Sequence, residues 1–130
     1  MLRLAFLLLF YLPFGKPIVV ADPIDNTAEL IKAGNIKELA KTFASSVELT
    51  ILADESIATP AQAEAALTTF FKANPVKSVT VVHRVNSNAN IKFAVLNMVT
   101  AGGTYRTSIS LKLVNGQFVL NELRIEAEKK

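Results

Sequence analysis

Residues 104–126, TYRTSISLKLVNGQFVLNELRIE, decide the fold. Apolar and polar side chains alternate through the first half of this stretch, as they do in a strand that buries one face. Asn115-Gly116 then supplies a two-residue hairpin turn, because both residues tolerate positive φ. The stretch therefore predicts two antiparallel strands. The first strand should cover one face with Tyr105, Thr107, Ile109, Leu111 and Leu113.

The second strand of this hairpin breaks the alternation. Counting outward from the turn places Phe118 and Leu120 on the covered face. Strict alternation would then turn charged side chains inward and leave apolar ones outside. The charged residues are Glu122, Arg124 and Glu126, and the apolar residues are Leu123 and Ile125.

Two arrangements resolve this conflict. A bulge near Asn121 would flip the alternation and return the two apolar residues to the core. Without a bulge, the three charged residues would meet Tyr105 and Thr107 at a polar mouth and could bind an acidic or hydroxylated ligand. The bulge is favoured, because buried charges need pairing and hydrogen bonds.

Three helices are predicted upstream, each starting at a pair of residues that can cap it. Gly34 should end the first helix, and Pro75 should end the third. The capping pairs are Asn26 with Glu29, Asn35 with Glu38, and Thr59 with Gln62. The second helix should bury Ile36, Leu39, Ala40 and Phe43, and the third Ala63, Leu67, Phe70 and Phe71.

The other segments are typical of strands, and their order predicts an α+β fold. A short hairpin precedes the third helix, and four long strands joined by tight turns follow it as an antiparallel meander. The order α-α-β-β-α-β-β-β-β predicts helices packed on one face of a curved sheet. The predicted strands are residues 47–52, 55–58, 76–87, 90–100, 104–114 and 117–126.

The element order resembles the cone of the nuclear-transport-factor-two-like superfamily, which includes SnoaL-like proteins and shares the cystatin-like fold. The residues are similar, more narrowly, to a family of small exported Bacteroidetes proteins of unknown function. This resemblance implies a fold and an exported location but no catalytic residue, and it implies that sheets of this kind often pair in dimers. The matching pieces are Gln62-Ala63-Glu64 with Leu67 and Phe70-Phe71, the strand Tyr105-Arg106-Thr107-Ser108-Ile109-Ser110-Leu111-Lys112, and Leu123-Arg124-Ile125-Glu126.

The N-terminus has the pattern of a secretory signal peptide. Arg3 is followed by an apolar run over residues 4–14, and Val19-Val20-Ala21 offers small residues for cleavage. The run is too short for a membrane span, which needs about 20 residues. We therefore expect a signal peptide at 1–21 and a single domain at 22–130, exported to the periplasm of a Gram-negative bacterium or secreted, with no membrane attachment after cleavage.

The composition excludes several classes of function. Hydrophobic residues make up 51% of the chain, and 16 of them lie in the first 21 positions. Beyond residue 21, 12 basic residues face 11 acidic ones, which does not indicate a nucleic-acid binder. The absence of cysteine excludes disulfides and thiolate metal sites. A single histidine and the lack of a glycine-rich phosphate loop predict no metal and no cofactor.

The residues that could perform acid–base chemistry are few. His83 is the only histidine and alternates with Val79, Val81 and Val85, which places it on an apolar face. Tyr105 could donate a hydrogen bond within a cone cavity, and Asp54 could act as a base there. Glu48 and Glu55 are more typical of solvated positions, and the same holds for Asp54 at its hairpin turn.

Basic residues are predicted to gather on the other face of the sheet, where they are typical of a solvated surface or a partner surface. They are Arg84, Lys92, Arg106 and Lys112. Lys92 would lie opposite Lys112, and two like charges in that position are unfavourable.

Three functional hypotheses follow. The favoured one is a non-catalytic periplasmic domain that binds a small apolar or hydroxylated ligand, or a partner protein, through the cone mouth or the sheet face. The second is an isomerase or dehydratase with His83 or Asp54 as base and Tyr105 as donor, which requires His83 and Tyr105 to face one closed cavity. The third is a structural module that forms a homodimer through the sheet face.

Overall fold

The computed structural model describes residues 22–128, so the predicted signal peptide lies outside the described residues. Residues 22–128 form three helices and six strands in the predicted order, which confirms the α+β fold class. The elements are α2 (Pro23–Ala33), α3 (Ile36–Ala40), β1 (Phe43–Ile51), β2 (Asp54–Ala58), α4 (Pro60–Ala73), β3 (Val76–Asn88), β4 (Ile91–Thr100), β5 (Gly103–Val114) and β6 (Gln117–Ala127).

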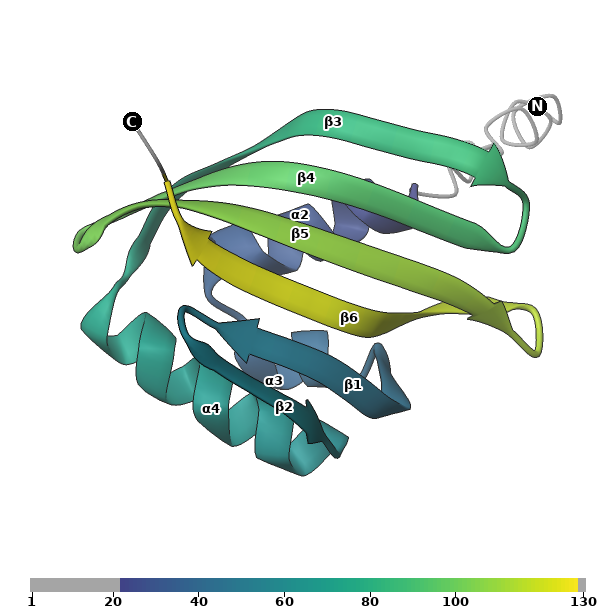
Figure 1. The fold of residues 1–130 in the computed structure, drawn as a ribbon, viewed down its shortest axis with the longest axis horizontal. Coiled ribbons are helices and arrows are strands. Elements are labelled where there is room, and N and C mark those ends of the chain that lie inside the picture. The colour runs from purple at the N-terminus through teal and green to yellow at the C-terminus, as the bar shows by residue number, and fades with distance from the viewer. Residues whose placement is uncertain (1–21, 129–130) are drawn as a thin grey trace, which may run out of the picture.

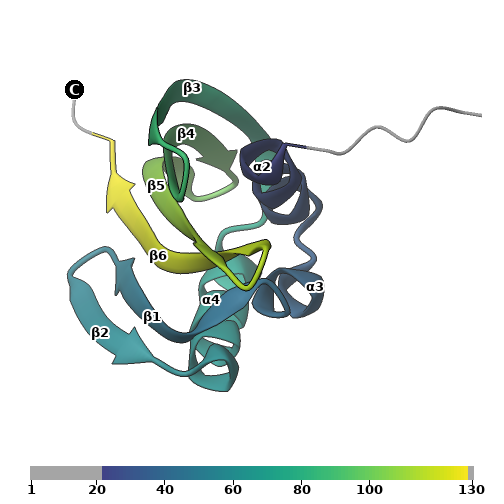
Figure 2. The same cartoon turned by 90° about the vertical axis from the view of Figure 1, so that its right-hand side faces the viewer.

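The six strands make one mixed sheet in the order β2-β1-β6-β5-β4-β3 (Figure 1). The four C-terminal strands form the predicted antiparallel meander. β1 runs parallel to β6 and joins the N-terminal hairpin to this meander, a pairing that no local pattern indicates. Seen from the side, the sheet curls around the helices (Figure 2). We call the face that the helices cover the inner face and the opposite one the outer face.

The helix starts follow the predicted caps in two cases out of three. At α4, Thr59 and Gln62 form a reciprocal capping box, and at α3 the Asn35 side chain accepts a hydrogen bond from the Glu38 amide. The prediction of Asn26 as the first cap was wrong. Helix α2 begins one turn earlier, because the Asp22 carboxylate accepts a 2.7 Å hydrogen bond from the Ile24 amide and Pro23 suits the first helical position.

The second helix is shorter than the sequence predicts. Helix α3 ends at Ala40, and the Thr42 hydroxyl donates a 2.7 Å hydrogen bond to the Leu39 carbonyl oxygen at that end. Phe43 is therefore the first residue of β1 rather than part of the helix. It is still buried, because the strand that it begins packs in the same core.

The inner face and the helices enclose a core that is filled by side chains. β4, β5 and β6 turn aliphatic residues toward α2 and α4, and the largest of them are fully buried. Burial of such side chains is worth about 1.5–3 kcal/mol each. The fully buried members from the sheet include Leu96, Met98, Ile109, Leu111, Leu123 and Ile125, and those from the helices include Ile24, Ile31, Leu39 and Leu67.

The bulge in β6 is confirmed. Leu111 pairs with Leu120 and Ser110 pairs with Glu122, which leaves Asn121 as the extra residue. The alternation flips at that point, and Leu123 and Ile125 reach the inner face with exposed fractions of 1% and 0%.

A second irregularity, in β3, was not predicted. Val81 pairs with Leu96 and His83 pairs with Val95, so Val82 has no counterpart and is exposed. The face of β3 reverses there, and His83 leaves the face that carries Val81. The prediction that His83 shares a face with Val79 and Val81 is therefore wrong, whereas Val85 does lie on the face of His83.

Candidate functional site

The cone interior does not bring the predicted catalytic groups together. Tyr105 lies on the inner face, where its ring packs edge-on against Phe70 with 5.3 Å between centroids. Its hydroxyl donates a 3.3 Å hydrogen bond to the side-chain oxygen of Asn74. His83 pairs with Val95 on the outer face and is exposed. The required arrangement, in which His83 and Tyr105 face one cavity, is therefore not what the structure shows.

Asp54 and Thr107 are also separated. Asp54 begins β2 and is exposed at a shallow groove of about 400 Å³ between the β1–β2 hairpin and α4. Thr107 is fully buried in the middle of β5, and its hydroxyl has no hydrogen-bond partner among the described residues. Within residues 22–128, no group of acidic or histidine side chains is arranged to hold a metal ion.

The charged residues of β6 lie on the outer face, so the polar mouth that would join them to Tyr105 and Thr107 does not form. The bulge at Asn121 is the cause, because it turns Glu122, Arg124 and Glu126 away from the helices. Arg124 lies between the two glutamates, with its Nη1 3.5 Å from Glu126 Oε2 and its Nη2 3.9 Å from Glu122 Oε2.

The parallel pairing of β1 with β6 extends this charged strip. It places Glu48 beside Glu122 and Thr50 beside Arg124, and β2 then adds Glu55 opposite Thr50. These residues border a hollow of about 300 Å³ together with Ile57, whose exposed fraction is 74%. A neighbouring hollow of about 520 Å³ is lined by Leu52, Ala53, Arg106, Glu126, Ala127 and Glu128. The alternation within β1 predicts that Glu48 points away from the core. It does not predict the neighbours of Glu48 on β6, because they come from a distant part of the chain.

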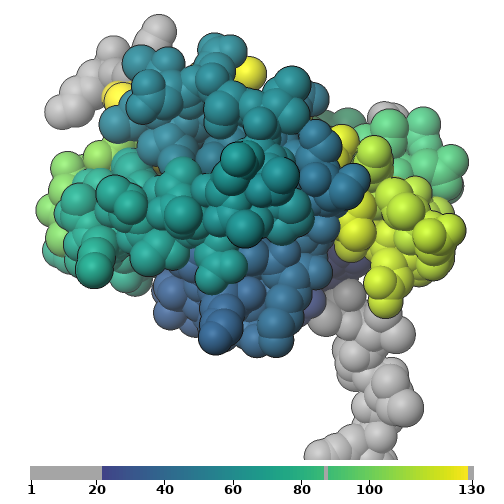
Figure 3. All heavy atoms as spheres, turned by 90° about the horizontal axis from the view of Figure 1, so that it is seen from below, coloured from purple at the N-terminus to yellow at the C-terminus, as the bar shows by residue number. Residues whose placement is uncertain are grey.

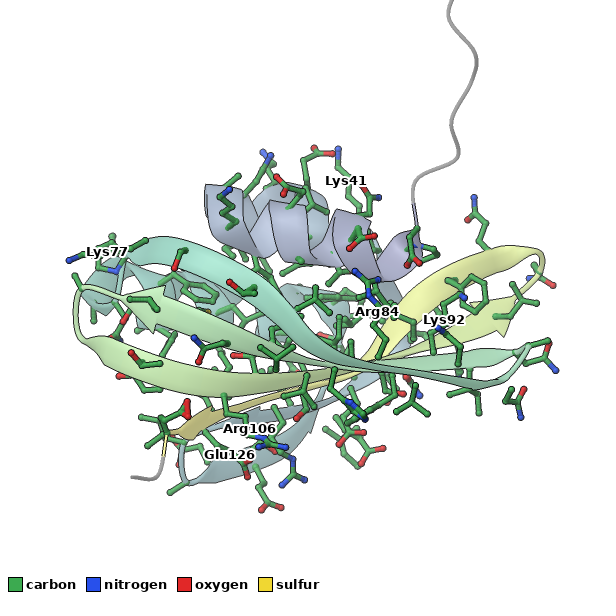
Figure 4. All side chains as sticks on the ribbon, turned by 90° about the horizontal axis from the view of Figure 1, so that it is seen from above. Lys41, Lys77, Arg84, Lys92, Arg106 and Glu126 are labelled. Carbon is green, nitrogen blue, oxygen red and sulfur yellow. The ribbon has the colours of Figure 1, made fainter. Side chains whose placement is uncertain are left out.

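The predicted basic surface is split between the two faces. Arg106 and Lys112 are on the outer face of β5, as expected. Arg84 and Lys92 lie on the helix side, and Figure 4 shows Arg84 directed toward α2 while Arg106 and Glu126 lie below the sheet. The prediction failed for Arg84 because of the bulge at Val82. It failed for Lys92 because Ile91, not Lys92, pairs with Lys112.

The two inner basic residues have structural partners. Arg84 forms an ion pair with Asp25 through a short hydrogen bond, and its Nη1 lies 3.6 Å from Asp22 Oδ2. The hydrogen bond to Asp25 raises the pKa of Arg84 above its ordinary value, partly offset by desolvation and aided by the charges of both aspartates. Lys92 lies over the Phe118 ring, 5.2 Å from its centroid. Both side chains thus tie elements of the cone together.

The outer face of β3 and β4 carries an apolar patch, although no helix covers it. Val95 is only 5% exposed, and Val85 and Phe93 beside it are half-buried. Ser108 and Ser110 follow on β5, and the charged strip of β6 comes next. The outer face therefore has an apolar patch on β3 and β4, two basic residues on β5 and a row of glutamates toward β1 and β2. Such a surface can bind another molecule, and it holds no acid–base pair around a cavity.

The comparisons with known proteins identify the family and the fold. A domain of unknown function, DUF4783, matches residues 24–126. A DUF4783 family protein from Bacteroides uniformis is 25% identical with a TM-score of 0.79, covering 84% of this chain and 100% of that one. One from Bacteroides ovatus is 25% identical with a TM-score of 0.75, covering 80% and 94%.

More distant structures show the fold. An NTF2-like protein from Cytophaga hutchinsonii is 12% identical with a TM-score of 0.61, and the match covers 83% of this chain and 100% of that one. No curated protein matches the chain. The NTF2-like cone and the Bacteroidetes relatives are both as the sequence predicts. The chain belongs to the DUF4783 family of domains of unknown function.

Proposed function

We propose that this protein is an exported, non-catalytic binding domain that works through the outer face of its sheet, and that a second copy of the chain binds there. The observation that carries the proposal is the outer face itself, which combines an apolar patch on β3 and β4 with opposite charges on neighbouring strands. The cone interior is packed with side chains in the part of the chain that the structure describes, and it separates the predicted catalytic groups. This geometry supports binding at the surface.

The charges on the outer face suit a second copy. Arg106 and Lys112 on β5 have no ion pair within residues 22–128, while Glu48, Glu55 and Glu122 lie on the strands beyond them. A twofold axis over the middle of the sheet would place the basic residues of one copy against the glutamates of the other. Isologous interfaces need such self-complementarity.

The area of the outer face is close to that of a standard interface. Six strands spaced about 4.8 Å apart, with about eight residues each, give a plane of roughly 600 Å², and side-chain relief adds to this area. A stable interface buries about 800 Å² per partner. The apolar patch with Val85, Phe93 and Val95 would lie against β1 and β2 of the other copy, where Ile57 is 74% exposed.

Light scattering on the purified protein tests this proposal. We expect a dimer for the natural chain and a monomer for the double variant Arg106→Glu, Lys112→Glu. Both positions would then be acidic and would repel the glutamates of the other copy. Adding Glu48→Lys and Glu122→Lys to this variant should restore the dimer. The control is Lys37→Glu with Lys72→Glu, which changes the charge equally on the helix side and should leave the mass unchanged. A monomeric natural chain, or a dimeric Arg106→Glu, Lys112→Glu variant, would contradict the proposal.

The export part of the proposal rests on the pattern of residues 1–21. The described residues contain no helix that is long and apolar enough to cross a membrane.

A further inference from the structure

A groove on the helix side of the molecule, separate from the outer face, has the features of a small-molecule site. It lies where the end of α2, the start of α3, helix α4 and the start of β3 meet. Its volume is about 530 Å³, within the range of about 300–1,000 Å³ that is usual for ligand pockets. Figure 3 looks onto the side of the molecule on which α3 (blue) and α4 (teal) lie next to each other.

Local sequence signals build this groove. Gly34 adopts a φ of 68° at the end of α2, so the chain reverses there and α3 starts two residues later. Asn74 and Pro75 end α4 in the same region, and Val76 leads into β3. The groove therefore lies between two chain reversals, which the capping bonds hold in place.

The floor of the groove is apolar. Ile36 is buried there, and Phe71 is half-buried with its ring edge-on to Phe70 at 5.2 Å between centroids. Pro75 and Val76 complete the floor. An apolar portion of a ligand could displace water from these side chains, which is favourable by about 25 cal/mol per Å² of buried area.

The rim of the groove is basic. Lys32, Lys37 and Lys72 line it from three different elements, and Glu64 is the one acidic side chain among the lining residues. None of these three lysines takes part in an ion pair within residues 22–128, whereas the neighbouring Lys41 is paired with Glu38 at 2.8 Å. Three unpaired ammonium groups against one carboxylate leave the rim electropositive, and a hollow lined by one sign of charge attracts ligands of the other.

From these features we infer that the groove binds a small organic anion with an apolar portion, such as a medium-chain carboxylate or alkyl phosphate. The headgroup lies between the three lysines, and the apolar portion lies on Ile36, Phe71 and Val76. Lys32 and Lys72 also have a simpler role, because they are in the last turns of their helices and favour those helix ends electrostatically. Lys37 is likewise in the last turn of the five-residue helix α3. The apolar floor has no such explanation, and the experiment separates the two roles.

The test is a titration of the purified, isotope-labelled protein with octanoate, octyl phosphate and octanamide, followed by NMR. We expect octanoate and octyl phosphate to shift the backbone amide signals of Gly34, Asn35 and Phe71. The neutral octanamide, of the same length, should bind at least about tenfold more weakly, because it lacks the charge that three exposed lysines attract. The ratio between the carboxylate and the phosphate identifies the preferred headgroup.

Matched variants complete the experiment. Lys37→Gln and Lys72→Gln should each weaken octanoate binding about two- to fivefold, and Lys41→Gln, at a lysine that does not line the groove, should leave it unchanged. A shift of other amides, equal binding of octanamide, or no binding would overturn the inference. So would a Lys72→Gln variant that melts at a lower temperature but binds octanoate as the natural chain does, because that result assigns the lysine to its helix end alone.

Discussion

At the scale of single residues, Thr107 is the clearest case of a polar group whose burial is uncompensated. Its hydroxyl is fully buried on the inner face and has no hydrogen-bond partner among the described residues. A buried unpaired polar group costs about 1–3 kcal/mol. We expect Thr107→Val, which keeps the shape and removes the hydroxyl, to raise the free energy of unfolding by about 1 kcal/mol in urea denaturation.

The same substitution at Thr100 is the matched control. The Thr100 hydroxyl donates a 2.8 Å hydrogen bond to the Gly103 carbonyl oxygen and accepts a 3.1 Å bond from the Gly102 amide. Thr100→Val should therefore lower the free energy of unfolding by about 1–2 kcal/mol. A loss of stability at both positions would show that Thr107 has a partner after all.

Position 102 requires glycine, because the Asn74 side chain occupies the space that a Cβ would need. A Cβ at this position would lie 2.0 Å from the Asn74 side-chain oxygen, which accepts the hydrogen bond from Tyr105. Gly102→Ala should force the Asn74 side chain to move and cost about 1–3 kcal/mol of stability, measured by thermal or urea unfolding. In an Asn74→Ala background the cost should fall below about 1 kcal/mol, and equal costs in both backgrounds would place the strain elsewhere.

At the scale of elements, the bulge at Asn121 decides which side of β6 meets the core. Deleting Asn121 would join Leu120 directly to Glu122, and plain alternation would then keep Leu123 and Ile125 on the inner face and Glu122 and Arg124 on the outer face. We therefore expect the deletion variant to unfold cooperatively in thermal denaturation followed by circular dichroism, with a loss of stability below about 3 kcal/mol. Asn121→Gly keeps the extra residue and should change stability by no more than about 1 kcal/mol. Loss of the cooperative transition in the deletion variant would show that the fold needs the bulge itself and not only the resulting alternation.

The bulge at Val82 has the opposite consequence, because it separates His83 from the core and brings Arg84 to α2. The Arg84 ion pairs with Asp22 and Asp25 then hold the start of the domain against the edge strand β3. The bulges at Asn121 and Val82 therefore determine on which face of the sheet the charged residues of β6 and β3 lie. They thereby determine which side chains make up the outer face.

At the scale of the whole molecule, Asp22, which directly follows the predicted cleavage point, takes part in the fold. Asp22 caps α2 and pairs with Arg84. If residues 1–21 are removed on export, protein recovered from the periplasmic fraction should have an intact mass that begins at Asp22. Ala21→Arg should block that cleavage, since small residues are needed there. A full-length mass for the natural chain would contradict the prediction.

The two proposed surfaces are on different sides of the molecule. The groove is lined by helix residues and the start of β3, while the proposed interface is the outer face of the sheet. Saturating octanoate should therefore leave the mass in light scattering unchanged, because the ligand would have no differential affinity for the two association states. A change in mass with octanoate would show that the two surfaces are coupled.

The sequence by itself determined the local structure. Alternation in residues 104–114, the Asn115-Gly116 turn and the Thr59 capping box predict the strands, turns and helix starts, because such signals act over a few residues. Even the bulge at Asn121 follows from the sequence, since strict alternation would have buried three charges. These signals predict the element order and the fold class, and the structure confirms both.

Only the tertiary structure decided how the surfaces are composed. The parallel pairing of β1 with β6, which sets Glu48 beside Glu122, joins segments far apart in the chain. The groove between Lys32, Lys37 and Lys72 likewise joins three elements. The bulge at Val82 has no sequence signal, because valine fits either face of a strand. Which side chains share a surface depends on long-range pairing and on these one-residue shifts, and local propensity contains neither.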